Sequence, residues 1–159
     1  METGGEKEFL RHTLATLAYR AEKALKGVPP HFPNLRIAEG ARTPAEILSH
    51  MCDLMDWALS LGKGTHVWRD TPPQGWDDDV ARFFGSLTSF DTFLVSGVDP
   101  GAQPGKLFQG PVADALTHVG QIALIRRLAG VPVRGENYFR ADIAAGRVGA
   151  DQSARRVEF

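Results

Sequence analysis

The sequence contains a single cysteine, Cys52, among its 159 residues. An intramolecular disulfide is therefore excluded, and a lone thiol agrees with a reducing cytoplasm, where we expect the protein to reside. The chain also lacks any apolar run approaching the roughly 18–20 residues that a membrane span needs. Its N-terminal residues, Met-Glu-Thr-Gly-Gly-Glu-Lys-Glu, lack the basic and apolar regions of a signal peptide. These absences predict no membrane as a partner.

The sequence also lacks an excess of either positive or negative charge. The chain has 18 Lys and Arg residues against 19 Asp and Glu residues, a formal net charge of −1. Such a balance gives no electrostatic reason to expect nucleic acid as a partner, and no predicted helix carries a basic stripe. The 43% hydrophobic and 23% charged residues are typical of a soluble globular protein, and the length suits one domain over residues 1–159.

Apolar residues recur at helical spacing in four segments of the chain. We predict core helices over residues 6–26, 43–61, 77–96 and 111–129, and a short extra helix over residues 137–145. No segment shows a convincing strand pattern. The sequence therefore predicts an all-α fold, a four-helix bundle with a short C-terminal helix.

Helix-start signals place the boundaries. Thr43-Pro44-Ala45-Glu46 is a capping box with proline at the first helical position. Pro111 suggests the same position for the last long helix, which makes residues 97–110 a predicted loop. Asn137 is the expected cap of the short fifth helix, and Gly146 is its expected end.

Three side chains that bind metals lie on or beside the inner faces of two predicted helices. Asp114 and His118 are four residues apart and so share one helix face, and His50 lies at the edge of an apolar stripe. Two imidazoles and one carboxylate can occupy one face of an octahedral metal and leave positions open for water or substrate. The sequence therefore predicts a divalent-metal site formed by these three residues. Such a cation lowers the pKa of bound water, polarises a substrate atom or binds a thiol as thiolate.

The same spacing has a second interpretation. Asp114 lies near the predicted start of its helix, where the helix dipole favours a carboxylate without any metal. It can also form an ion pair with His118 at the i,i+4 spacing. At the level of the sequence both interpretations stay open.

Three neighbours are candidates for the outer part of the site. Asp53 lies one turn after His50, and Gln121 lies three residues after His118, so each could orient a ligand. Trp57, together with the loop that carries Trp68 and Trp76, could line a pocket over the metal. The plainer interpretation is a solvated side chain for the two polar residues and ordinary packing for the tryptophans.

The stretch Asp114-x-x-x-His118-Val119-Gly120-Gln121-Ile122, preceded by His50 in the second helix, resembles the DinB/YfiT-like superfamily. The pattern of that superfamily is a histidine in helix two and a later helix that reads His-x-x-x-His-Arg-Gly-Gln-Ile. The resemblance covers the order of the four helices, and its most specific part is His118-x-Gly-Gln-Ile. It implies a DinB-like bundle with an up-down-down-up path, a three-histidine site for nickel, zinc or iron, and frequent homodimers.

Two positions depart from the pattern of the superfamily. His50 and His118 match the first and third ligands, but Asp114 replaces the second histidine and Val119 replaces the usual arginine. A carboxylate favours harder metals than imidazole does, so manganese joins the candidates. Otherwise the site is degraded and holds no metal.

Known members of the superfamily include thiol-dependent S-transferases and isomerases, relatives of amide hydrolases, and the iron-binding domain of sulfoxide synthases. The resemblance therefore implies a metal-dependent thiol S-transferase or hydrolase that acts on a small molecule. The alternative is a non-catalytic, dimeric binding or stress-associated protein.

Overall fold

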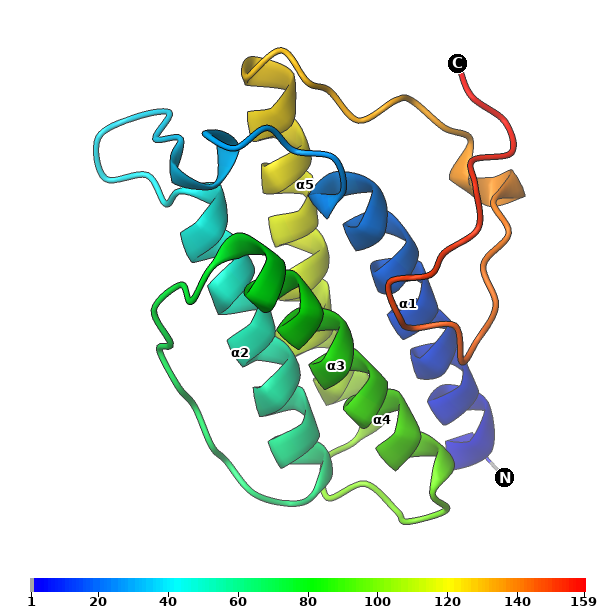
Figure 1. Ribbon diagram of the computed structural model, residues 1–159. Coiled ribbons are helices and arrows are strands. Elements are labelled where there is room, and N and C mark those ends of the chain that lie inside the picture. The colour runs from blue at the N-terminus through cyan, green and yellow to red at the C-terminus, as the bar shows by residue number, and fades with distance from the viewer. Residues whose placement is uncertain (1) are drawn as a thin grey trace.

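The computed structural model describes residues 2–159, with side chains from Gly4 onward. Four long helices dominate it (Figure 1): α1, Glu2–Leu25; α2, Pro44–Gly62; α3, Trp76–Val95; and α5, Ala113–Leu128. Across residues 2–159 no strand forms, and the one element of β pairing is an isolated bridge between Glu136 and Glu158. The predicted all-α fold on four main helices is confirmed.

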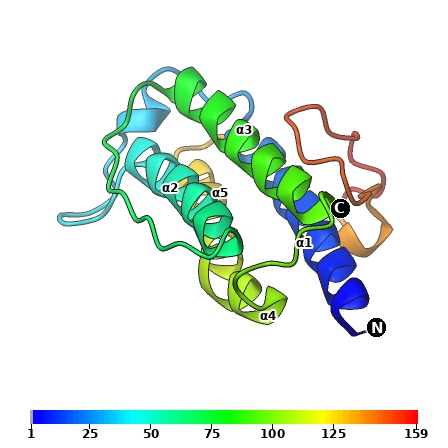
Figure 2. The ribbon, with the colours of Figure 1, turned by 90° about the horizontal axis from the view of Figure 1, so that it is seen from below.

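One apolar core is shared by the four helices. α1 and α2 each pack against both α3 and α5, as the two views of the bundle show (Figures 1 and 2). The helical spacing of apolar residues predicted for the first segment is confirmed, since the residues of the inner stripe of α1 are each at most 2% exposed: Leu10, Leu14, Leu17, Ala21 and Ala24. Each buried leucine of such a stripe contributes about 1.5–3 kcal/mol to folding. In the described chain, no helix combines the length and the apolar character that crossing a bilayer requires.

The start of α2 is fixed by the predicted capping box. The backbone N–H of Glu46 donates to the Thr43 hydroxyl over 3.2 Å, and the backbone N–H of Thr43 donates to the Glu46 carboxylate over 2.8 Å. Pro44 occupies the first helical position, where a missing N–H costs nothing. The cap fixes the residue at which α2 begins. Because His50 follows less than two turns later, the cap also fixes the direction in which its side chain points.

The last long helix begins earlier than its sequence predicts. A first α-helical turn, α4, covers Pro104–Leu107, a π-helical segment, η2, covers Phe108–Val112, and α5 follows without a break. The backbone angles at Leu107 and Ala113 are right-handed helical, so residues 104–128 form one helical run. The prediction that Pro111 opens the helix, and that residues 97–110 form a loop, is therefore wrong; Pro104 holds the opening position.

Pro111 explains the π-helical segment. In a regular α-helix its ring would clash with the carbonyl of Leu107, and its missing N–H would leave that carbonyl without a partner. The wider turn accommodates the ring, and the Ala113 N–H donates to the Phe108 carbonyl five residues back. π-Bulges of this kind occur often at functional sites.

The C-terminal segment packs along α1 and is mostly irregular. The predicted helix over residues 137–145 is wrong, because the structure has only a 3₁₀ turn, η3, at Tyr138–Arg140. Asn137 does cap that turn, accepting from the Phe139 N–H. Contacts with α1 hold the segment: the buried Tyr19 hydroxyl donates to the Glu136 carboxylate at 2.6 and 2.8 Å. Local helix signals cannot anticipate a conformation that depends on partners more than a hundred residues away.

Arg126 joins the end of α5 to the end of α1. Its guanidinium is buried and donates to the carbonyls of Ala24 and Lys26 over 2.9 and 2.6 Å, and to that of Val131 over 2.9 Å. The last carbonyls of α1 have no partner within the helix. Arg126 thus supplies the C-terminal cap of α1 from a different helix.

Candidate metal centre

The three predicted ligands converge between α2 and α5. His50 projects from the middle of α2, and Asp114 and His118 project from one face of α5, one turn apart. One ligand atom from each residue lies within 4.8 Å of those of the other two. The two imidazole rings are perpendicular, with centroids 4.8 Å apart. The structure therefore brings together three donors that could hold one metal ion.

The distances within this triad suit ligands around a cation better than hydrogen bonds. Nε2 of His50 lies 3.5 Å from Oδ2 of Asp114, and Nε2 of His118 lies 3.4 Å from Oδ1. Protein N–H···O hydrogen bonds span about 2.7–3.2 Å. Two atoms each bound to one metal at about 2.0–2.1 Å, at a tetrahedral angle, stand about 3.3–3.4 Å apart. Each imidazole faces a different oxygen of the Asp114 carboxylate at close to the second separation, so the residues present could hold a cation.

Exposure within the triad is uneven. The side chains of His118 and His50 are 10% and 17% exposed, whereas that of Asp114 is 47% exposed. A cation here would have two recessed imidazoles on one side and a carboxylate toward solvent. Positions on the outer side would then be free for water or a substrate atom.

The position of Asp114 removes one interpretation of its role. It lies ten residues after Pro104, within an unbroken helical run, and not in the first turn of a free helix. The dipole at a helix start falls off within the first turn, so it does not account for a carboxylate here. The remaining explanation for a carboxylate at this position is its proximity to His50 and His118.

Gln121 orients His118. Nδ1 of His118 and Oε1 of Gln121 are 2.7 Å apart, and because an amide oxygen can only accept, the imidazole carries its proton on Nδ1. Nε2, the nitrogen that faces Asp114, is then left with a free lone pair for a cation. A metal-ligating histidine almost always donates its other N–H in this way.

His50 is kept in its neutral form. Burial lowers the pKa of its imidazole, and Arg42 and any proton charge on His118 lower it further, although Asp114 acts in the opposite direction. The neutral imidazole is the form that binds a metal. Arg42 immediately precedes the capping box and lies outside α2, so no helical spacing identifies it from the sequence.

Asp53 does not serve His50. Its buried carboxylate accepts from the Thr71 backbone N–H over 2.8 Å, from the Thr71 hydroxyl over 2.7 Å, and from Arg82 over 2.7 Å. The suggested role of Asp53 as the orienting partner of His50 is therefore wrong, because its carboxylate is bound to Thr71 and Arg82 instead. Asp53, on α2, thus binds Thr71 in the connection between α2 and α3 and Arg82 on α3, next to the site.

Trp57 lies at one end of an aromatic chain that reaches the triad. The ring centroids of Trp57 and Trp68 are 5.6 Å apart, and those of Trp68 and His50 are 5.5 Å apart, both in edge-to-face geometry. Trp68 therefore packs directly against His50, while Trp57 packs against Trp68. Trp76 lies elsewhere and packs on Phe32. Of the tryptophans suggested as pocket lining, only the first two are near the triad.

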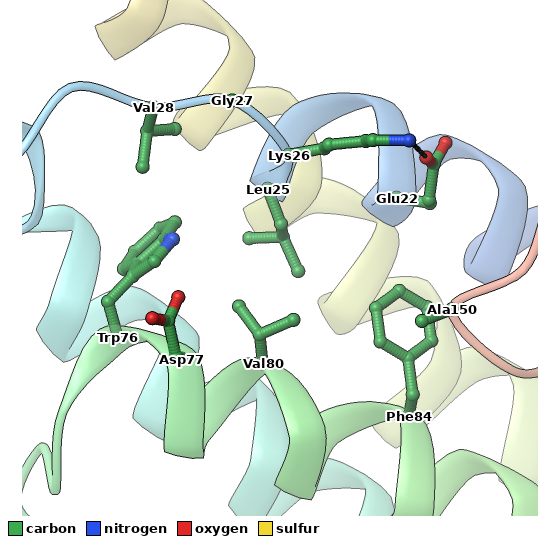
Figure 3. Close-up of a pocket in the computed structure, with 10 residues that line it drawn as sticks. All are labelled: Glu22, Leu25, Lys26, Gly27, Val28, Trp76, Asp77, Val80, Phe84 and Ala150. Carbon is green, nitrogen blue, oxygen red and sulfur yellow. Dashed lines mark ion pairs between the residues drawn. The ribbon is translucent and has the colours of Figure 1, made fainter.

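Two hollows border the triad. One, of about 330 Å³, has His50 in its wall, together with Glu46, Asp70 and Thr71. The other, of about 300 Å³, has His118 and Gln121 in a wall that is otherwise mainly apolar. A further hollow of about 370 Å³ lies between the end of α1 and the start of α3 and contains none of the three ligands (Figure 3).

Cys52 is not a ligand. It is buried, its thiol donates to the Asp79 carbonyl over 3.3 Å, and burial raises its pKa to about 12. A thiol for any transfer reaction must therefore come from outside the protein. No family model, curated protein or solved structure matches this chain, so similarity alone assigns it to no family.

Proposed function

We propose that the protein binds one divalent cation through His50, Asp114 and His118 and uses it in a transfer or hydrolysis reaction on a small molecule. The observation that carries the proposal is the triad itself: three donors from two helices lie within 4.8 Å of one another, close enough to hold one cation. Nickel, zinc, iron and manganese all accept a set of two imidazoles and one carboxylate. When bound, such a cation activates water or an external thiol as a nucleophile.

The residues of the chain have separate tasks in this scheme. Gln121 holds the imidazole of His118 with its lone pair inward. Burial and Arg42 keep His50 neutral. Trp68 packs edge-to-face against His50 and supports its ring from one side. Asp114, the most exposed of the three, leaves the outer side open to a reactant.

A place in the DinB/YfiT-like superfamily remains part of the proposal. It is supported by His118-x-Gly-Gln-Ile on the last long helix and by His50 on the second. The long 63–75 connection, which runs back along α2 before α3 begins (Figure 1), supports the up-down-down-up path. By this analogy the reaction is a thiol S-transfer or a hydrolysis.

The test is the metal content of protein purified without a histidine tag. We expect close to one zinc, nickel, manganese or iron(II) ion per chain, and loss of that ion in the double variant His50→Ala, His118→Ala. The matched control is His12→Ala, His31→Ala, which removes two exposed histidines outside the triad. Equal metal content in the two double variants would refute the proposal.

Asp114 provides a second, graded test. Asp114→Ala should weaken metal binding by more than about tenfold, since a lost ligand costs at least as much as a lost orienting partner. Asp114→His restores the superfamily pattern and should shift preference from manganese toward nickel and zinc. Identical metal affinities in both variants and the parent would show that Asp114 is not a ligand.

The second candidate function is a non-catalytic, dimeric binding protein with a degraded metal site. The presence of Asp114 and Val119 where the superfamily has histidine and arginine favours it. Titration of the metal-free protein with the four cations separates the two candidates. Binding no tighter than about millimolar, which is roughly 4 kcal/mol, would support the non-catalytic function.

A further inference from the structure

The two hollows beside the triad differ in chemistry and meet at one side chain. Arg42 lines both, on the same side of the molecule as the ligands. The hollow that contains His118, here called the apolar groove, is lined chiefly by Ile37, Ile47, Leu124 and Ile125. Ile37 and Leu124 are 44% and 55% exposed, so apolar surface next to the triad is left open to solvent.

Arg42 is the cation available at this boundary. Glu46, one turn further along α2, is already paired with Arg36 and bonded to the Thr43 N–H. Among the side chains that the structure describes, those of residues 4–159, none forms an ion pair or hydrogen bond with the Arg42 guanidinium. An exposed arginine beside an apolar groove can bind a carboxylate or phosphate through two parallel N–H donors.

The polar hollow disfavours an anion on its own side of Arg42. Glu46, Asp53 and Asp70 all line it, and although each has a hydrogen-bonded partner, their negative charges remain. An anionic group therefore approaches Arg42 from the groove that holds His118. The rest of such a molecule would lie on Ile37 and Leu124 and remove their apolar surface from water.

From this arrangement we propose that the substrate is a small amphiphilic anion, with its acidic group on Arg42, its apolar chain in the apolar groove and its reacting atom at the triad. The proposal rests on the function proposed above and narrows it to one substrate class. Pockets of about 300 Å³ are large enough for small-molecule ligands. The mainly apolar wall with one placed charge is typical of such sites.

Sodium octanoate added to the metal-free, full-length protein tests the groove. Amide ¹H–¹⁵N spectra should show shifts concentrated at Ile37, Arg42, Gln121 and Leu124. Arg42→Ala should weaken binding about fivefold, as expected for a partly exposed ion pair. Leu124→Ser should weaken it as well. Arg69→Ala, which removes an exposed arginine from a different hollow, should leave the affinity unchanged.

Any of these binding results would overturn the proposal: no saturable shifts, equal affinity for octylammonium, or shifts centred on the hollow of Figure 3, around Val28, Trp76 and Val80. An equal loss in Arg42→Ala and Arg69→Ala would show a nonspecific charge effect and would also overturn it. Metal uptake is measured separately on the same variants. A protein that binds octanoate in the groove but takes up no cation contradicts the metal function and not the groove.

Discussion

The hydrogen bond between Gln121 and His118 makes the sharpest prediction about the metal centre. Gln121→Met keeps the length of the side chain and its helix propensity but removes the acceptor for the Nδ1 proton, 2.7 Å away. The imidazole of His118 then loses both the bond that fixes its tautomer and the bond that fixes its ring angle. Outer partners of this kind are worth about 10–100-fold in metal affinity, or about 1.4–2.8 kcal/mol.

The assay is competition for zinc against a chromophoric chelator at pH 7.5, with the metal-free protein as the starting state. Gln109→Met is the matched control, since Gln109 is an exposed glutamine in the same helical run. Gln121→Glu keeps an acceptor and adds a negative charge, so its zinc affinity should equal or exceed that of the parent. An affinity within twofold of the parent for Gln121→Met would refute the assigned role, provided that the circular dichroism spectrum is unchanged.

Three further predictions concern the scaffold and the lone thiol. Arg126→Met leaves the final carbonyls of α1 without donors, so it should lower the free energy of unfolding, measured in urea, by about 3–5 kcal/mol. The control Arg127→Met changes an exposed neighbour and should lower it by less than about 0.5 kcal/mol. Equal losses in the two variants would disprove the capping role. Asp53→Asn should weaken the attachment of the 63–75 connection through Thr71 and Arg82, seen as faster proteolysis there than in the exposed-site variant Asp70→Asn. The Cys52 thiol, whose pKa burial raises to about 12, stays protonated at pH 8, so iodoacetamide should modify it only after unfolding; rapid labelling of native protein would contradict its buried position.

Much of the fold follows from local patterns in the sequence. The inner stripe of α1 and the capping box at Thr43–Glu46 depend on residues within a few turns of each other, and the structure confirms both. The sequence does not define the start of the last helix, because two prolines, Pro104 and Pro111, each fit an opening position. Only the π-helical turn, which has no sequence signature of its own, lets the second proline lie inside the helix.

In the candidate site, too, the sequence indicates the features that depend on nearby residues and misses those that depend on distant ones. His50, Asp114 and His118 could be selected because each lies on a helix whose phase the sequence defines. The partner of Gln121 followed from its i,i+3 spacing, but that of Asp53 did not, since Thr71 lies in an irregular connection. The sequence does not indicate the role of Arg126 either, because its partners are carbonyls at the end of α1, about a hundred residues earlier.

The π-helical segment Phe108–Val112 also constrains how this chain can change in length. Each residue of an α-helix advances the side-chain direction by about 100°. A π-helical turn holds one residue more than an α-helical turn, so deleting one residue within η2 would restore a regular α-helix and keep Asp114 and His118 directed toward His50, whereas a deletion at the start of α5 would turn His118 by about 100°. Point substitutions at the exposed Phe108 and Gln109 leave that phase unchanged. A related chain with a regular α-helix here would align with this one only through a single-residue gap, placed directly before the two ligands.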